Sequence, residues 1–148
     1  MNASTPSPSW QVIAILIARL IFAGIFAMAA AFKFADMNGT AGYIASIGFP
    51  FPLLLAWLAA LFEVALLLCL LTGAYFTEAA LLAAAYVLFL AFAFHGPARW
   101  KPDDPTEFGF FVDHFTFIAG LLFAAVHGAG SVLAVRKSIL GERSMRPG

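Results

Sequence analysis

Apolar residues form four long runs along the chain, separated by short polar breaks. A helix of about 20 residues crosses a hydrocarbon core roughly 30 Å thick. Backbone groups in lipid must be hydrogen-bonded internally, so runs of this length predict helices. The pattern predicts an all-α fold, a four-transmembrane-helix bundle, with helices at Val12–Ala35, Pro52 or Leu53 to Leu71, Thr77–His95 and about Phe110–Val135.

The two longer connections between these runs differ in character. From Met37 to Pro50, apolar residues recur between glycines, which predicts a short interfacial helix that ends at Gly48. From Gly96 to Gly109, prolines and charged residues dominate, which predicts an irregular polar loop. We expect Trp100 in this loop to lie at the membrane interface.

The polar ends of the chain define the expected domain organisation. We predict a disordered N-terminal tail at 1–11, a four-helix transmembrane domain at 12–137 and a C-terminal cytoplasmic tail at 138–148. The first apolar run differs from a secretory signal because it is too long, contains Arg19 and has no basic segment before it.

Composition excludes several classes of protein. Of the 148 residues, 63% are hydrophobic and 11% are charged, whereas a soluble domain has roughly 25% charged residues. Eight basic residues balance eight acidic ones, and no basic stripe is present to bind nucleic acid. Cys69 is the single cysteine, which excludes disulfides within the chain and thiolate metal sites. The chain is therefore expected to be an integral membrane protein.

The distribution of basic residues predicts the orientation. Four lie after the fourth run and three lie on the opposite side, at Lys33, Arg99 and Lys101. This bias predicts that both termini are cytoplasmic, in a multi-pass protein of the inner (plasma) membrane.

Three ionisable residues fall at similar expected depths in three different helices. Arg19 lies about 10 Å, Glu63 about 13 Å and His127 about 12 Å from the same membrane face, at 1.5 Å per residue. Charged groups inside a membrane are costly and often functional, so we take these three as candidate catalytic residues. The alternative interpretation is that Arg19 and Glu63 form a structural ion pair that fixes helix register.

A second polar group is expected toward the opposite face, as a ligand-binding site or a proton path. Its members are Lys33, His95, Asp113 and His114. Asp113 and His127 are fourteen residues apart, which places both on one helix face, while His114 points about 100° away. The histidine spacing does not specify haem or any metal site, and we predict none.

Several short motifs follow one another in the order found in a known family. They are Ala18-Arg19-Leu20 with Gly24 and Lys33, then Gly48-Phe49-Pro50-Phe51-Pro52, Glu63, Leu70-Leu71-Thr72-Gly73, His95 and Gly128-Ala129-Gly130-Ser131. With this set on four apolar runs, the chain resembles the DoxX family of small four-helix bacterial membrane proteins between Ala14 and Val135. The chain departs from the family after this motif: members often continue it as Ser-Leu-Asp, whereas Ser131-Val132-Leu133-Ala134 contains no acid.

The resemblance implies a membrane subunit or accessory of a redox system. One relative is the quinone-reducing membrane partner in thiosulfate oxidation, and others are linked to oxidative-stress complexes. The bundle is also similar to that of eukaryotic sterol-binding and sterol-isomerising proteins.

Two hypotheses about function follow, and both stay open at this point. In the first, the chain is a quinone-linked oxidoreductase subunit, with quinone as a bound ligand and electrons supplied by a partner redox subunit or a small reductant. In the second, it is a non-catalytic protein that binds a hydrophobic small molecule or a partner helix. Under both hypotheses the protein acts in the lipid bilayer and does not bind nucleic acid. No motif for a resident cofactor occurs in the chain.

Overall fold

The computed structural model describes residues 9–135 and 138–140. Four of its helices are long and apolar enough to cross a membrane, which confirms the predicted fold class. The helices are α1 (Trp10–Ala35), α2 (Met37–Ser46), α3 (Pro52–Thr72), α4 (Phe76–His95), the short 3₁₀ helix η1 (Pro97–Arg99) and α5 (Thr106–His127).

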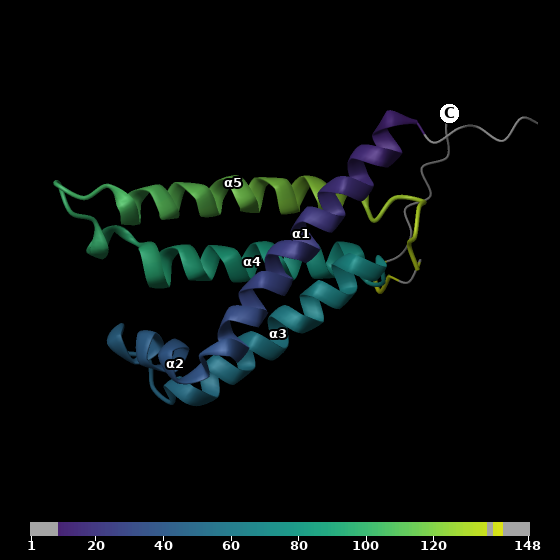
Figure 1. The fold of residues 1–148 in the computed structure, drawn as a ribbon. Helices are drawn as coiled ribbons and strands as arrows, with labels where there is room; N and C mark the ends of the chain where they lie inside the picture. Colours follow the sequence, from purple (N-terminus) through teal and green to yellow (C-terminus); the bar gives the residue numbers. More distant parts are fainter. Residues whose placement is uncertain (1–8, 136–137, 141–148) are drawn as a thin grey trace, which may run out of the picture.

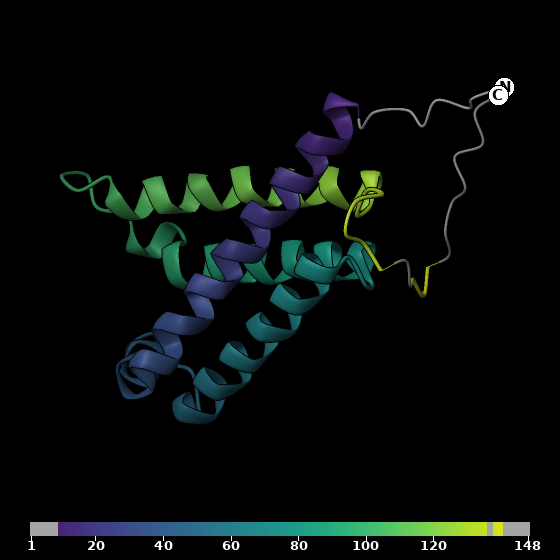
Figure 2. The ribbon, with the colours of Figure 1, turned by 45° about the vertical axis from the view of Figure 1, so that its right-hand side comes forward.

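The four long helices pack as two pairs. One pair is α1 with α3, and the other is α4 with α5. Figure 1 shows that the pairs cross each other at a clear angle, and the rotated view in Figure 2 agrees. The helix α2 packs on α3 at the end of the bundle that also holds η1, which we call the loop end. The turn between α3 and α4, the start of α1 and the end of α5 lie at the opposite end, the turn end.

Small side chains make up much of the contact surface between the helices. On α4, five alanines are buried, and Ala80, Ala83 and Ala91 have no measurable exposure. Small residues let helix backbones approach closely, which is the main source of packing energy where lipid removes the hydrophobic effect. Most large apolar side chains of α1, α3 and α5 point outward, as expected for helices in a bilayer.

The fourth membrane helix ends earlier than predicted. It begins at Thr106 and stops at His127, because Gly128 has φ +77° and Gly130 has φ +75°. Such values are accessible to glycine and strained for other residues, so the helix does not continue. Residues 128–135, predicted to be helical, therefore form an irregular segment. Of the predicted tails, residues 1–8 and 141–148 lie outside the described residues, whereas Trp10 and Gln11 belong to α1.

The predicted interfacial helix is present as α2, which ends at Ser46, just before Gly48 with φ +87°. The loop between α4 and α5 is irregular, as predicted, apart from η1. Before α5, hydrogen bonding from Thr106 lowers the pKa of the exposed Asp104 carboxyl, which is therefore charged at neutral pH.

Candidate functional site

A buried carboxylate lies at the centre of the candidate site. The Glu63 side chain is 2% exposed, and its Oε1 accepts hydrogen bonds from Lys33 Nζ at 2.8 Å and from the Tyr86 hydroxyl at 2.9 Å. The other oxygen, Oε2, is buried and has no hydrogen-bond partner among residues 9–135 and 138–140. Three helices thus meet at one carboxylate that still has hydrogen-bonding capacity.

Side-chain direction explains why Lys33 reaches Glu63. Helical side chains lean toward the N-terminus of their own helix. The helices α1 and α3 run in opposite directions, so Lys33 leans toward the turn end and Glu63 leans toward the loop end. The Lys33 ammonium also lies 3.5 Å from the Ala29 carbonyl oxygen, one turn back on α1. The two side chains therefore converge although they start at different depths.

A cleft of about 440 Å³ opens beside this carboxylate, and we call it the polar lobe. The helices α1 to α5 all contribute to its wall, and Lys33, Tyr86, His95 and His114 are among the residues that supply ionisable or hydroxyl groups. The remaining lining residues are Ala29, Phe32, Thr40, Tyr43, Ile44, Ala59, Leu90 and Phe94. Both side chains that donate hydrogen bonds to Glu63, those of Lys33 and Tyr86, thus line the cleft.

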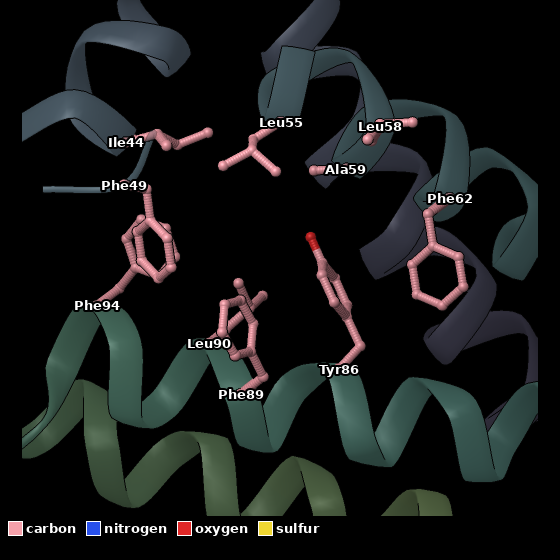
Figure 3. A pocket seen from close by; sticks show the side chains of 10 residues that line it. All are labelled: Ile44, Phe49, Leu55, Leu58, Ala59, Phe62, Tyr86, Phe89, Leu90 and Phe94. Atoms are coloured by element: carbon pink, nitrogen blue, oxygen red, sulfur yellow. The ribbon is translucent and has the colours of Figure 1, made fainter. Parts of the chain in front are cut away.

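A second cavity of about 290 Å³ adjoins the first, and we call it the apolar lobe. Figure 3 shows its side chains, which come from α2, the following loop, α3 and α4, with the Tyr86 hydroxyl directed toward α3. It shares five lining residues with the polar lobe: Ile44, Ala59, Tyr86, Leu90 and Phe94. Its other lining residues are Phe49, Leu55, Leu58, Phe62 and Phe89.

A polar cluster lies at the loop end of the polar lobe. His95 Nδ1 donates to Glu107 Oε2 at 2.7 Å, and Arg99 lies 3.6 Å from the other oxygen of Glu107. The rings of His95 and His114 are 5.0 Å apart. The Arg99 guanidinium also lies over the Tyr43 ring at 5.8 Å. This cluster connects the cleft to the polar loop at the edge of the membrane.

The predicted ion pair between Arg19 and Glu63 is wrong. Arg19 is 1% exposed, but it donates to the backbone oxygens of Ala129 at 2.7 Å and Leu133 at 2.8 Å. On antiparallel helices, Arg19 leans toward the turn end and Glu63 toward the loop end, so they point away from each other. Arg19 lines neither lobe and instead holds the segment that follows α5.

The predicted inward positions of His127 and Asp113 are also wrong. Both residues are exposed, and His127 Nδ1 donates to the Phe123 carbonyl on its own helix. The inward face of α5 is rotated by one residue from the predicted one and runs through His114, Phe117, Leu121 and Ala125. Arg19, Glu63 and His127 therefore do not form a common layer.

Two residues of the site were missed from the sequence. Tyr86 is the one tyrosine in the third apolar run, and a buried tyrosine hydroxyl needs a partner, so its position was a usable signal. Glu107 was assigned to the polar loop, where a charge has an ordinary explanation. Lys33, Glu63, His95 and His114 were predicted and do lie at or beside the cleft.

The described residues contain no group of three or more His, Cys, Asp or Glu side chains that could hold a metal ion. The polar groups of the cleft are instead suited to hydrogen bonding with an organic ligand, since an ammonium and a hydroxyl bind carbonyl or hydroxyl oxygens.

The chain matches a known protein family. The family model DoxX matches residues 14–96, more than half of the chain. The matched part includes Arg19, Lys33, Glu63, Tyr86 and His95. Comparisons with curated proteins and with solved structures find no match.

Proposed function

The chain belongs to the DoxX family and is a multi-pass membrane protein, and from this premise we propose that it binds a quinone as a membrane subunit of a redox system. One observation carries the proposal: the buried Glu63 is bonded to Lys33 and Tyr86, and both of these groups line the polar lobe. A quinone needs an apolar cleft that offers a few hydrogen bonds to its oxygens, and this cleft has both properties.

The residues at the carboxylate suit both redox forms of such a ligand. An ammonium has three donors, and Lys33 uses one for Glu63 and points another toward Ala29 O, which leaves one for a carbonyl in the cleft. The Tyr86 oxygen, which lines the cleft, can accept from a hydroxyl. The site can therefore hydrogen-bond a carbonyl before reduction and a hydroxyl after it.

Conversion of a quinone to a quinol takes up two electrons and two protons. In this proposal a partner redox subunit supplies the electrons. The Lys33 ammonium delivers a proton to each ligand oxygen in turn, and the Glu63 carboxylate holds the ammonium in place. Lys33 is recharged from the loop end, where His95 and His114 line the same lobe and Glu107 is bonded to His95. Histidine is suited to this relay because its ordinary pKa lies near neutrality.

We also propose the orientation. Four basic residues follow α5, at positions 136, 137, 143 and 146, and three lie at the loop end. The excess supports a topology with the turn end and both termini in the cytoplasm of a bacterial cell and the loop end outside.

A second candidate function is supported by the apolar lobe, whose lining has Tyr86 as its one polar side chain. A lobe of this kind also fits a protein that holds a hydrophobic molecule without converting it. Such a protein would need Glu63 for packing and charge pairing but would not need a proton donor.

Mass spectrometry of the bound small molecules tests the proposal. Wild-type protein is purified in a mild detergent from cells that make quinone, and the organic extract is compared with those of Glu63→Gln and His127→Ala. We expect near-stoichiometric quinone from wild type and His127→Ala and its loss from Glu63→Gln protein that remains folded. Phospholipid alone in all three extracts would contradict the proposal and favour the non-catalytic function.

A further inference from the structure

The apolar lobe is not used by the chemistry at Glu63, although the two cavities are neighbours. They have five lining residues in common, and Tyr86 presents its hydroxyl at their junction. Lys33, His95 and His114 line the polar lobe alone. A ligand with an oxygen atom near Tyr86 could therefore extend in one direction toward charge and in the other toward hydrocarbon.

The lining of the apolar lobe favours an apolar ligand over water. The Phe49 ring stacks on Phe94 with centroids 6.4 Å apart and meets Phe89 edge-on at 5.9 Å. Water in a cavity needs two to four polar partners, which aromatic and aliphatic side chains do not supply. An unsaturated or saturated hydrocarbon chain matches this wall better than water does.

The apolar lobe also has an exit toward lipid. Leu58 on α3 is 53% exposed and Phe89 on α4 is 51% exposed, although both line the lobe. Their exposed surfaces lie on membrane-spanning helices, so hydrocarbon surrounds them in a bilayer. A chain that occupies the lobe can leave it between these helices without entering water.

We propose that the apolar lobe is a tail subsite, which makes the ligand an amphiphile with an oxygen-bearing ring and a long hydrocarbon chain. The ring lies in the polar lobe, the first part of the chain lies in the apolar lobe, and the rest passes into the bilayer near Leu58. If each carbon takes about the 30 Å³ of a liquid water molecule, a lobe of about 290 Å³ holds on the order of ten carbons. This inference rests on the proposed binding of a quinone ring.

Photo-crosslinking with two probes tests the tail subsite. Both probes are a benzoquinone with a ten-carbon chain; one carries a diazirine next to the ring and the other carries it at the far end of the chain. Each is added to the full-length protein in phosphatidylcholine nanodiscs and irradiated, and the labelled residues are mapped by mass spectrometry. We expect the ring probe to label residues of the polar lobe and the chain probe to label the apolar lobe, at Phe49, Leu55, Phe62 or Phe89.

A substitution that fills the apolar lobe can be compared with a control substitution at a neighbouring residue outside the lobe. Leu55 is half-buried in the apolar lobe, whereas its neighbour Leu54 is 57% exposed and lines neither cavity. We expect Leu55→Trp to reduce chain labelling on the order of tenfold, because a filled cavity excludes the chain, while Leu54→Trp leaves it unchanged. Leu58→Trp, at the exposed rim, replaces Leu55→Trp if that protein does not fold.

The two probes separate failure of the tail subsite from failure of quinone binding. Ring labelling in the polar lobe with chain labelling spread evenly over the outer faces of the helices would overturn the tail subsite and leave quinone binding intact. Absence of ring labelling in the polar lobe would overturn quinone binding. Chain labelling of the apolar lobe that excess phosphatidylcholine removes would assign that lobe to an acyl chain of bilayer lipid and overturn the tail subsite.

Discussion

Arg19 and Glu63 are equally buried charges, but their surroundings differ. Each is 1% exposed. Arg19 is bonded to two backbone oxygens at the turn end, whereas Glu63 is bonded to two side chains that line a cleft. Burial of a charge inside a membrane protein therefore does not indicate function by itself. The groups that bind the charge, and whether they are open to a cavity, separate the two cases.

The chemistry of the two groups agrees with this difference. The oxygens that Arg19 binds follow the end of α5, where backbone acceptors have lost their helical partners. A guanidinium is always charged and has five donors, so it is suited to permanent bonding of this kind. A carboxylate can gain and lose a proton, and that suits Glu63 to a site where a ligand changes its hydrogen bonds.

The largest effect on stability is expected for Arg19→Met. Hydrogen bonds to charged groups contribute about 1.5 to 3 kcal/mol each, so loss of both should lower the free energy of unfolding by about 3 to 6 kcal/mol. Thermal unfolding of the detergent-solubilised protein measures this, with Lys101→Met at an exposed position as the control. An Arg19→Met protein that keeps its stability but loses bound quinone would contradict the structural role of Arg19 and assign it to the ligand site instead.

A double-mutant cycle between Lys33 and Glu63 should show a smaller effect on stability. We expect Lys33→Met and Glu63→Gln each to cost about 2 kcal/mol, less than a fully buried pair, because the Lys33 side chain is 21% exposed. The double variant should be more stable than the sum of the two losses predicts, by about 1 kcal/mol or more, as for groups in contact. Additive losses of unfolding free energy would contradict the ion pair. We also expect bound quinone to be absent from all three variants.

Tyr86→Phe removes one hydroxyl and keeps the ring. Loss of its hydrogen bond to Glu63 should lower the free energy of unfolding by about 1 kcal/mol. Quinone affinity, measured by titration into nanodiscs, should fall several-fold because the cleft loses a polar group. Tyr75→Phe, at an exposed tyrosine in the turn between α3 and α4, is the matched control. Unchanged affinity would remove Tyr86 from the ligand site.

The smallest effect is expected for His127→Ala. The side chain is exposed and bonded to its own helix, so the free energy of unfolding should change by less than about 0.5 kcal/mol. Bound quinone, measured in the organic extract, should stay at the wild-type level. A loss of quinone in this variant would restore His127 to the site and contradict the placement of the cleft.

The sequence-predicted residues that lie at or beside the cleft are those whose position in a helix was itself unusual. A lysine near the end of an apolar run and a glutamate within one are costly in lipid, so Lys33 and Glu63 stand out without any structure. Prediction was wrong where it depended on the rotation of a helix about its axis or on which charged side chains form a pair. A rotation of α5 by one residue, about 100°, exchanges His114 for Asp113 on the inner face. Estimates of depth placed Arg19 beside Glu63 because they ignored the direction in which each side chain leans.

Hydropathy along the chain is sufficient to predict the membrane location, the four spans and the interfacial helix, because each depends on local length and composition. Glycine ended α5 earlier than the apolar pattern indicated, since a backbone with φ near +77° at Gly128 cannot continue a helix. Packing alone decided which charges meet, because that depends on the crossing of the two helix pairs and on side-chain direction. The cleft that joins Lys33, Tyr86 and His114 exists only in the assembled bundle, where surfaces from all the long helices come together.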